Sequence, residues 1–375
     1  MMREKRMNLN IKSENRNRIF NTIRRQRSVS RQDLVYQLNL SLPTVTQNLT
    51  DLIQQGLVCE NGSFGHTGGR RARAYSLVSN AKCGIGLDIT RNHVAVVIAD
   101  LNGDIIYHKR IRLAFSKTSG YFQHLGVLVA EAVSKQNLSD QQILGVGIAV
   151  PGLITQDNSR IFYGKILDFE NLTIESFSQD IPYPCKLFND ADAAGFAEMC
   201  QNPDLTDAFY ICLSNNIGGS VLIDHKVYKG EGSRSGEVGH MTIVPNGETC
   251  YCGQRGCFET YCNATILSDL CDGNLECFFD RLSKNDRDCN KIWKEYLACL
   301  SIAVNNVRML FDCKVILGGY VGAYIEPYMD EVRRLAGMRN PFESNADYLI
   351  PCTVKKEALA AGAALSFITD FVHYV

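Results

Sequence analysis

One histidine and three cysteines in the second half of the chain are spaced as ligands for a metal ion. The set has the pattern His-x9-Cys-x-Cys-x4-Cys and consists of His240, Cys250, Cys252 and Cys257. Three thiolates and one imidazole suit tetrahedral Zn²⁺, and four protein ligands leave no open position for chemistry. The pattern therefore predicts a structural zinc site. The alternative is a group of buried, unligated thiols, which we expect for the chain's other cysteines.

The chain around these ligands has 375 residues, a net charge of −1 and 45% hydrophobic residues, which favours two or three domains with large cores. No apolar run approaches the roughly 18 residues of a membrane span, and the polar, basic start lacks a secretion signal. We therefore expect a soluble, cytoplasmic protein. Its charge is asymmetric, because residues 1–78 hold 13 Lys and Arg against 5 Asp and Glu, and the rest holds 26 against 35.

The basic segment carries the pattern of a winged helix-turn-helix. Helices are predicted over residues 14–25, from Ser30 with Asp33 in its first turn, and from Ser41 to a stop at Gly56. Strands over 57–60 and 74–77 would flank a glycine-rich wing. Residues 1–78 are thus interpreted as a domain that binds double-stranded operator DNA. The alternative is a small helical cap with a charged surface.

Five residues of this segment are candidates for DNA contact. In the third helix, the residues predicted to face inward are Leu42, Val45, Leu49, Leu52 and Ile53. The outward face would then present Thr44, Gln47, Asn48 and Asp51. Of these, Thr44, Gln47 and Asn48 are our candidate base contacts, since amides can pair with adenine in the major groove. Arg70 and Arg71 of the wing are candidates for phosphates or a narrow minor groove.

The rest of the chain alternates strands and helices in two similar halves. The first half has predicted strands over 83–89, 93–100, 104–111 and 143–150 and a helix over 121–134. The second has strands over 208–213, 220–223 and 314–317 and a helix over 291–310. This repetition predicts a duplicated α/β core, in which strand-to-loop transitions deliver backbone N–H groups to a cleft between two lobes.

Five ordered motifs resemble the ROK family of repressors and sugar kinases. They lie at residues 236–241, 250–259 and 188–194, at Pro151-Gly152 and at Gly318-Gly319. The resemblance covers about residues 80 to 375, and the preceding winged helix is what the family's repressors carry. It implies a two-lobed, actin-like (ribonuclease-H-like) ROK domain over 79–375, with the zinc motif at 240–257.

The resemblance also implies a sugar site. The family's sugar contacts correspond here to Asn189, Asp190, Glu237, His240 and Glu259, and we expect Gly152 to lie beside the bound sugar as well. Carboxylates and amides make strong hydrogen bonds to a polyhydroxylated ligand. Asp190 matches the family's catalytic base, which takes a proton from the acceptor hydroxyl in the kinases. His240 can serve twice, with one ring nitrogen on zinc and the other donating to a sugar hydroxyl.

The family's nucleotide loops are altered in this chain. In place of Asp-x-Gly-Gly-Thr, residues 88–92 keep Asp88 and have Thr90 where a glycine is usual. In place of Gly-Thr-Gly-x-Gly-Gly-Gly, residues 214–220 keep only Gly218 and Gly219 among the glycines. The third loop keeps Gly318 and Gly319 but continues with a bulky tyrosine. Phosphates need closely approaching backbone amides, which side chains obstruct.

These features favour a sugar-responsive DNA-binding regulator, a repressor of carbohydrate-utilisation genes, over a catalyst. A monosaccharide or sugar phosphate bound in the cleft would close it and move the DNA-binding domains of a homodimer, or of a dimer of dimers, out of register with the operator. One alternative is an ATP-dependent sugar kinase, of the glucokinase or N-acetylhexosamine kinase type, with Asp190 as its base. Another is a sugar-independent scaffold that uses the body only for oligomerisation.

Overall fold

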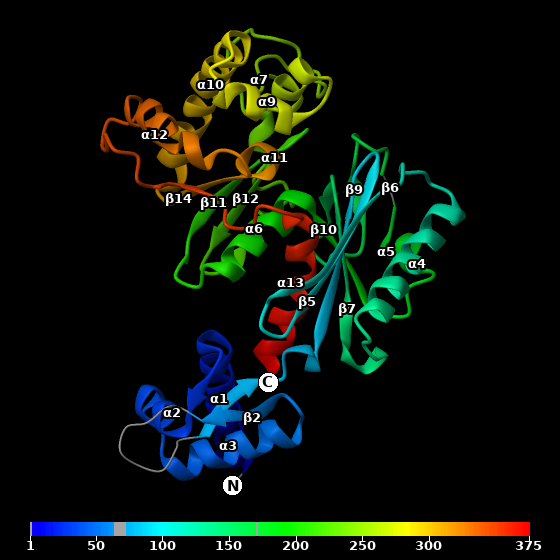
Figure 1. Ribbon diagram of the computed structural model, residues 1–375, viewed down its shortest axis with the longest axis vertical. Helices are drawn as coiled ribbons and strands as arrows, with labels where there is room; N and C mark the ends of the chain where they lie inside the picture. Colours follow the sequence, from blue (N-terminus) through cyan, green and yellow to red (C-terminus); the bar gives the residue numbers. More distant parts are fainter. Residues whose placement is uncertain (1, 64–72, 170–171) are drawn as a thin grey trace.

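The N-terminal region is a three-helix unit followed by a two-stranded wing. The computed structural model describes residues 2–63, 73–169 and 172–375 (Figure 1). The elements of this head are α1 (Met2–Gln26), β1 (Val29–Ser30), α2 (Arg31–Leu38), α3 (Leu42–Gln54), β2 (Val58–Ser63) and β3 (Arg73–Leu77). The strands form one sheet in the order β1-β3-β2. The three predicted helices and the two strands predicted to flank the wing are present, whereas residues 64–72 of the predicted wing lie outside the described residues.

Local capping explains where the short helices begin and end. Ser30 and Asp33 form a capping box at α2, with each side chain bonded to the other residue's backbone N–H. Ser41 accepts the Thr44 N–H at the start of α3. Asn39 and Gly56 follow α2 and α3 with φ of 52° and 70°, which is the left-handed geometry that ends helices.

The predicted faces of α3 are wrong at three positions. Asn48 is only 2% exposed and donates a hydrogen bond to the Thr44 carbonyl oxygen at 2.8 Å. Leu42 and Ile53, which we expected to face inward, are 52% and 38% exposed. Because Asn48 lies three residues after Val45 and four before Leu52, it falls within the buried arc of the helix, whereas Leu42 and Ile53 lie at its edges.

The first lobe is built on a five-stranded sheet with the strand order β10-β7-β4-β5-β6. Its strands are β4 (Cys83–Ile89), β5 (His93–Asp100), β6 (Ile105–Arg112), β7 (Ile143–Val150) and β10 (Cys185–Asn189). Its helices are α4 (Ser119–Lys135) and α5 (Ile174–Ser178). A separate small sheet pairs β8 (Leu153–Ile154) with β9 (Ile161–Tyr163). The strands predicted in this half are all present.

The second lobe repeats the plan, with the strand order β13-β12-β11-β14-β15. Its strands are β11 (Ala208–Leu213), β12 (Ile217–Ile223), β13 (Lys226–Val227), β14 (Lys314–Gly318) and β15 (Leu349–Pro351). Its helices are α7 (Phe258–Cys262), α8 (Thr265–Ser268), α9 (Leu275–Ser283), α10 (Arg287–Phe311), α11 (Gly319–Gly322) and α12 (Met329–Gly337). Strand β12 begins three residues earlier than predicted, so Gly218 and Gly219 lie in the strand, paired with β11, and not in a loop.

Two helices lie between the lobes, α6 (Asp190–Gln201) and α13 (Ala358–Tyr374) (Figure 1). Strands β4 and β7 approach α13 so closely that side chains would collide with it. A Cβ on Gly86 would lie 1.8 Å from the Ala360 carbonyl oxygen, and one on Gly147 would lie 2.4 Å from that of Ala363. These strand glycines therefore permit close packing of helix on sheet.

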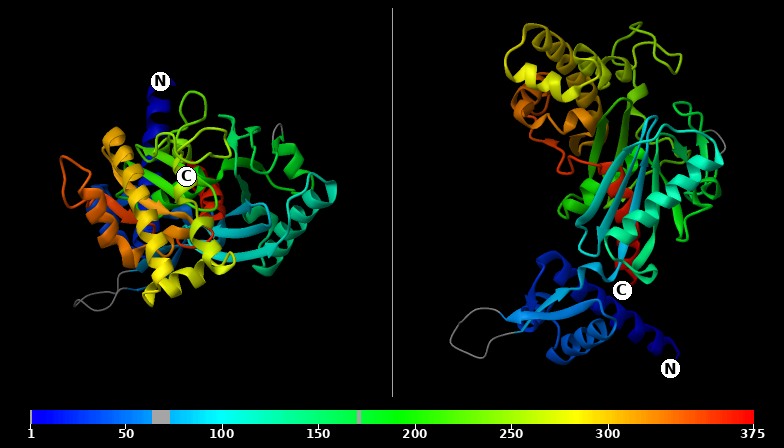
Figure 2. Two further views of the ribbon diagram at one scale, coloured as in Figure 1. Left: turned by 90° about the horizontal axis from the view of Figure 1, so that it is seen from above. Right: turned by 45° about the vertical axis from the view of Figure 1, so that its right-hand side comes forward.

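The head packs directly onto the body. Figures 1 and 2 place the C-terminus, at the end of α13, against the head. The Asn17 side chain donates to the Val372 carbonyl oxygen at 2.5 Å, and Arg16 donates to that of Val375. One continuous apolar cluster joins α1–α3 to α13, and Arg27 pairs with Asp104 at 2.6 Å. Within the described residues, no helix combines the length and apolar character needed to cross a bilayer.

Candidate functional site

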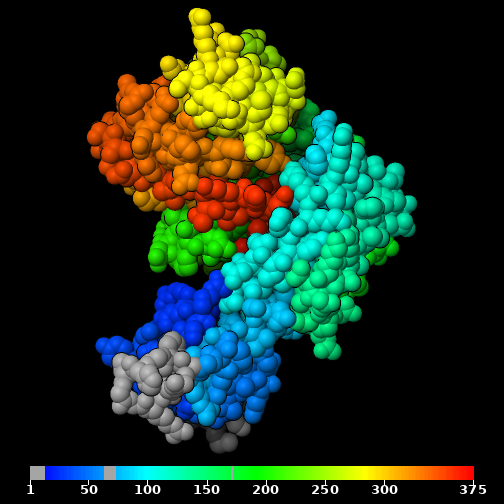
Figure 3. Space-filling model, viewed as in Figure 1, coloured from blue at the N-terminus to red at the C-terminus, as the bar shows by residue number. Residues whose placement is uncertain are grey.

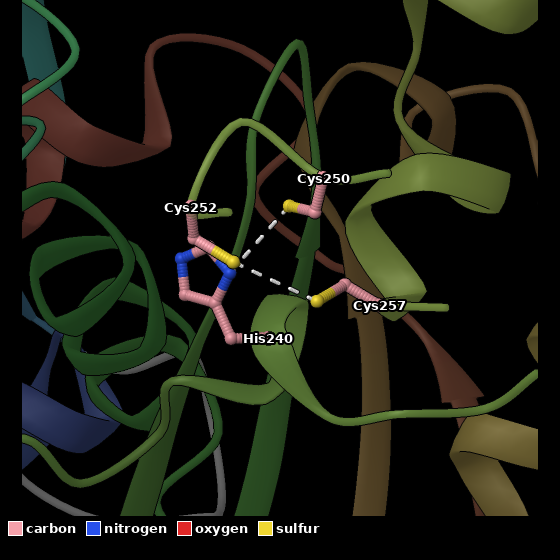
Figure 4. Close-up of side chains that lie close together, drawn as sticks. All are labelled: His240, Cys250, Cys252 and Cys257. Atoms are coloured by element: carbon pink, nitrogen blue, oxygen red, sulfur yellow. Dashed lines mark hydrogen bonds between the residues drawn. The ribbon is translucent and has the colours of Figure 1, made fainter. Parts of the chain in front are cut away.

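The four predicted metal ligands converge at one point of the second lobe (Figure 4). Their ligand atoms, from His240, Cys250, Cys252 and Cys257, all lie within 4.8 Å of one another. The Cys250 Sγ is 3.9 Å from the His240 Nδ1, and the Cys252 Sγ is 3.8 Å from the Cys257 Sγ. Gly253 and Gly256 turn the chain between the cysteines with φ of 94° and 78°.

This geometry fits a tetrahedral zinc site. Zn–S bonds of about 2.3 Å at tetrahedral angles place two sulfur ligands about 3.8 Å apart. The 3.8 Å separation of Cys252 and Cys257 matches that spacing and is far longer than a disulfide bond of about 2.05 Å. The second ring nitrogen of His240, Nε2, lies 3.2 Å from the Tyr251 hydroxyl. The imidazole therefore connects the cysteine cluster to the wall of the neighbouring cleft.

A large cleft of about 1110 Å³ opens between the two lobes. Beside the cysteine cluster it continues into a smaller hollow, because Pro151, Lys165, Asp190, Asn216 and Tyr251 line both. Five of the six predicted sugar contacts line this hollow, namely Gly152, Asn189, Asp190, Glu237 and His240. The end of β7, the start of α6 and the turn before the cysteine loop bring them together. The fold therefore assembles the predicted set from three distant segments.

Asn189 and Asp190 are held at the first turn of α6. The Asn189 Oδ1 accepts the Asp192 N–H at 3.0 Å, and its Nδ2 donates to the Gly152 carbonyl oxygen at 3.0 Å. The Asp190 carboxylate accepts the Ala191 N–H at 2.8 Å. Asn189 thus caps the helix and fixes the Pro151-Gly152 turn at the same time.

Glu259 does not line the hollow but lies directly behind it. It is only 4% exposed, accepts the Ile217 N–H at 2.5 Å and accepts from the Asn216 side chain at 3.1 Å. That Glu259 contacts the sugar stays a prediction, because in this arrangement Glu259 is not among the residues that line the hollow. Its carboxylate instead holds Asn216, whose amide lines both the hollow and the cleft.

The hollow is crowded with carboxyl groups whose pKa values are raised. Burial raises the pKa of Asp190 to about 6. Burial, together with the neighbouring Asp190, Asp192 and Glu259, raises the pKa of Glu237 to about 7. Carboxyl groups in this state can both donate and accept hydrogen bonds near neutral pH. They suit a neutral ligand with many hydroxyl groups.

The opposite end of the cleft holds the altered nucleotide loops, and several of their amides are bonded within the protein. The Gly319 N–H donates to the Tyr210 hydroxyl at 3.0 Å, and the Tyr320 N–H donates to the Ser214 Oγ at 3.3 Å. Gly318 and Gly319 are required by packing, since a Cβ on them would lie 2.2 Å from the Tyr210 Oη and 2.7 Å from the Leu213 N. These two glycines therefore have a structural role without any phosphate.

The first loop is likewise folded onto itself. The Thr90 N–H and hydroxyl both donate to the His93 carbonyl oxygen at 3.0 Å, and the His93 N–H donates back to the Thr90 Oγ1 at 3.2 Å. Asp88 is 3% exposed and its Oδ1 lies buried without a hydrogen-bond partner. Burial raises the pKa of Asp88 to about 7.

The head presents only part of the predicted DNA contact set. Gln47 is exposed on α3 and donates to Asp51 at 2.8 Å, and Thr44 is half-buried beside the Ser41 cap. Asn48 is buried, and Arg70 and Arg71 lie outside the described residues. The exposed face of α3 also includes Thr50, which the sequence analysis did not select.

The family assignment rests on the body of the chain. The sequence profile of the ROK family matches residues 84–369. The chain belongs to the ROK family. Among curated relatives, the xylose repressor of Bacillus spizizenii is 27% identical over 379 residues, covering 97% of each chain.

Two solved ROK structures share the fold. A ROK family transcriptional regulator, described as a homologue of the E. coli MLC protein, superposes with a TM-score of 0.75 at 19% identity, covering 97% of both chains. A ROK family glucokinase from Streptomyces griseus, in complex with glucose and AMPPNP, gives a TM-score of 0.63 at 21% identity. The kinase matches 76% of this chain, whereas the regulator matches the ROK body and its N-terminal head together.

Several residues at this ROK site were missed from the sequence. Asn216 and Tyr251 line the hollow, and Lys165 reaches across the cleft to donate to the Tyr251 carbonyl oxygen at 3.2 Å. Tyr251 stands between two zinc-motif cysteines, so its position in the sequence was an available signal. Lys165 and Asn216 lie in loops, and nothing in their local pattern indicated that they meet.

Proposed function

We propose that the protein is a sugar-responsive transcriptional repressor of the ROK family, in which a sugar bound beside Asp190 changes the affinity of the head for operator DNA. One observation carries the proposal. The sugar end of the cleft presents a converging set of carboxyl and amide groups, whereas the Gly319 and Tyr320 N–H groups at the nucleotide end are bonded within the protein. The name of the Bacillus relative, a xylose repressor, supports the same reading.

Zinc is proposed as the structural cofactor, held by His240, Cys250, Cys252 and Cys257. Its contribution there is to fix the cysteine loop and the orientation of the His240 ring. The sugar is held by side chains of the protein. Asn189, Asp190 and Glu237 hydrogen-bond to sugar hydroxyls, and the His240 Nε2 can bond to another hydroxyl once its contact with the Tyr251 hydroxyl is broken. Glu259 is a positioning residue, because it acts through Asn216.

The head, residues 1–78, is proposed as a winged helix-turn-helix domain that docks α3 in the major groove and reads bases with Gln47 and Thr44. Arg70 and Arg71 are proposed to contact phosphate in the wing. The buried Asn48 is withdrawn from the contact set. The ROK body, residues 79–375, is proposed to form a homodimer or a dimer of dimers, which places two heads on two half-sites.

The decisive experiment is a gel-shift titration of the full chain on its operator. Xylose, glucose, N-acetylglucosamine and their phosphates are added one at a time. We expect one of them to change the operator Kd by 5-fold or more, as a coupling of this kind requires. If none of them changes it, the proposed function is wrong.

The second candidate is a sugar kinase, favoured by one observation, the retained Asp190 at the position of the family's base. A coupled ATP-consumption assay with aldohexoses and N-acetylated hexosamines separates the two functions. Asp190→Asn removes the base but keeps the side-chain volume. We expect no turnover in the wild type and a weakened sugar response in the variant. Turnover in the wild type that the variant abolishes would establish the kinase instead.

A further inference from the structure

The nucleotide end of the cleft contains a bridge between the lobes that no motif indicated. Arg110 lies on β6, the edge strand of the first lobe, and its guanidinium donates to the Tyr320 hydroxyl of the second lobe at 2.9 Å. The same guanidinium pairs with the Glu357 carboxylate at 3.3 Å. Its Cζ also lies 5.7 Å from the centre of the Tyr320 ring, within cation–π range.

The bridge occupies the region between two altered nucleotide loops. Tyr320 directly follows Gly318-Gly319, at a position where the family commonly has another glycine. Asp88 lies close enough to Arg110 and Glu357 for their charges to affect its pKa. The side chains of Asp88, Arg110 and Tyr320 line the same cleft. In place of the charge and hydrogen bonds of a bound phosphate chain, this site contains a guanidinium, a phenol and a carboxylate from the protein itself.

Glu357 connects the bridge to the helix that reaches the head. It is the residue immediately before α13, and its backbone has a φ of 48°, which is unusual for a residue other than glycine. Its carbonyl oxygen accepts the Ala361 N–H at 2.9 Å, so it is also part of the first turn of α13. The helix then runs 17 residues, about 25 Å, to the carbonyl groups that bond Arg16 and Asn17 of α1.

Other contacts between the lobes lie nearer the sugar end. Lys165 donates to the Tyr251 carbonyl oxygen, Gln156 donates to that of Gly230 at 2.8 Å, and Lys229 donates to the Asn158 side chain. None of these three is joined to α13. The bridge differs from them because it ties both lobes to the start of the helix that contacts the head.

We propose that Arg110, Tyr320 and Glu357 form an internal tie that takes the place of a nucleotide and sets the operator affinity of the sugar-free protein through α13. This inference rests on the proposed function. It adds that the lobes of this repressor need no second ligand to define their resting arrangement. Sugar binding would then change the arrangement of the lobes from one defined sugar-free state. The change would reach the head because α13 starts at the tie and ends on the head.

The test compares Tyr320→Phe and Arg110→Ala with two matched controls in the full chain. Tyr324→Phe removes a phenol hydroxyl from the same cleft, and Arg112→Ala removes an arginine from the same strand; neither has a hydrogen bond or ion pair between the lobes within the described residues. The readouts are the sugar-free operator Kd and the rate of amide hydrogen exchange in residues 358–362.

We expect each bridge variant to weaken sugar-free operator binding about 5- to 10-fold and to speed exchange in residues 358–362, while both controls stay within 2-fold of wild type. The double variant should be no worse than the stronger single variant, since the two residues act as one unit. Bridge variants that behave as the controls do, or a double variant whose effect is the product of the singles, would overturn the proposal.

Two further outcomes keep this proposal separate from the proposed function. If no sugar changes the operator Kd of the wild type, the proposed sugar-responsive function is wrong. Hydrogen exchange and the sugar-free operator Kd of the bridge variants then still test the tie. If exchange increases and operator affinity does not change, the link through α13 is wrong. Protection of residues 88–93 or 318–322 in the wild type by Mg-ATP would show that the site still accepts a nucleotide and would also overturn the proposal.

Discussion

The two ends of the cleft differ in the hydrogen bonds that their polar groups already make within the protein. At the sugar end, Asn189, Asp190 and Glu237 converge beside the cysteine cluster and line a small hollow of about 60 Å³. At the nucleotide end, Arg110 and Tyr320 meet across the large cleft, and the Gly319 and Tyr320 N–H groups are bonded to Tyr210 and Ser214. A phosphate cradle needs unpaired amides, and a sugar pocket needs exposed carboxyl and amide groups. The comparison supports the proposed function, in which the site binds a sugar and does not transfer phosphate.

The head lies below the two lobes and contacts them over a small part of its surface (Figure 3). The contacts that reach it come from α13 and from the hairpin around Asp104. Both belong to the lobe junction or the first lobe. A change at either end of the cleft can therefore reach the DNA-binding surface through these elements, and also through α6, whose Ala197 belongs to the same apolar cluster.

The largest effect on this difference between the two ends is expected from removing a predicted metal ligand beside the sugar end. Cys252→Ser should lose bound zinc and lower sugar affinity by about 100-fold, because the ring of His240 is then no longer fixed. Metal analysis and calorimetric titration with the active sugar measure both effects. Cys313→Ser, in the same lobe but outside the cluster, is the control. Sugar affinity retained without metal would show that zinc does not hold the pocket.

Substituting a glycine at the nucleotide end tests whether the packing of the folded chain by itself requires glycine there. Gly319→Ala should destabilise the protein by about 3 kcal/mol, because φ is 78° and the new Cβ would lie 2.7 Å from the Leu213 N. Gly273→Ala is the matched control, since its φ is 84° but no atom lies within 4 Å of its Cβ, so only about 1 kcal/mol is expected. Urea unfolding measures both. Equal costs would mean that close packing at Gly319 contributes nothing.

The last prediction concerns the buried carboxyl group of Asp88, beneath the bridge. Because the pKa of Asp88 is raised to about 7, the folded protein keeps a proton that the unfolded chain loses near pH 4. Wild-type stability therefore falls between pH 4 and 7, whereas Asp88→Asn avoids this loss. We expect the variant to gain up to about 4 kcal/mol at pH 8, since the pKa rises by about three units and each unit corresponds to about 1.4 kcal/mol, and almost nothing at pH 4, measured by thermal unfolding.

The groups that face Asp88 across this pH range come from several elements. They are Arg110, Tyr121, Asp190, Cys212, Tyr320 and Glu357. The pKa of Asp190 is itself raised by burial to about 6, so it titrates in the same window. A stability difference that stays constant from pH 4 to 8 would show that Asp88 is ionised throughout and that burial does not control it.

Much of this molecule follows from local sequence. The helix caps at Ser30 and Ser41, the strand order along the chain and the four predicted metal ligands depend on residues close together in the sequence. The structure confirms the elements and brings the four predicted ligands together. Local patterns are readable because each depends on a few neighbouring side chains or on a fixed ligand chemistry. The altered nucleotide loops were visible for the same reason, since a missing glycine can be seen at one position.

Only the tertiary structure decided the rest. Asn48 proved to be buried, because the width of the buried arc on α3 depends on what α1 and α2 cover and not on the helix alone. Glu259 lies behind Asn216, an outcome of how α7 meets β12. The bridge joins residues 110, 320 and 357, which share no motif. Contacts between residues so distant in the chain are fixed by the packing of whole lobes, and no local pattern encodes them.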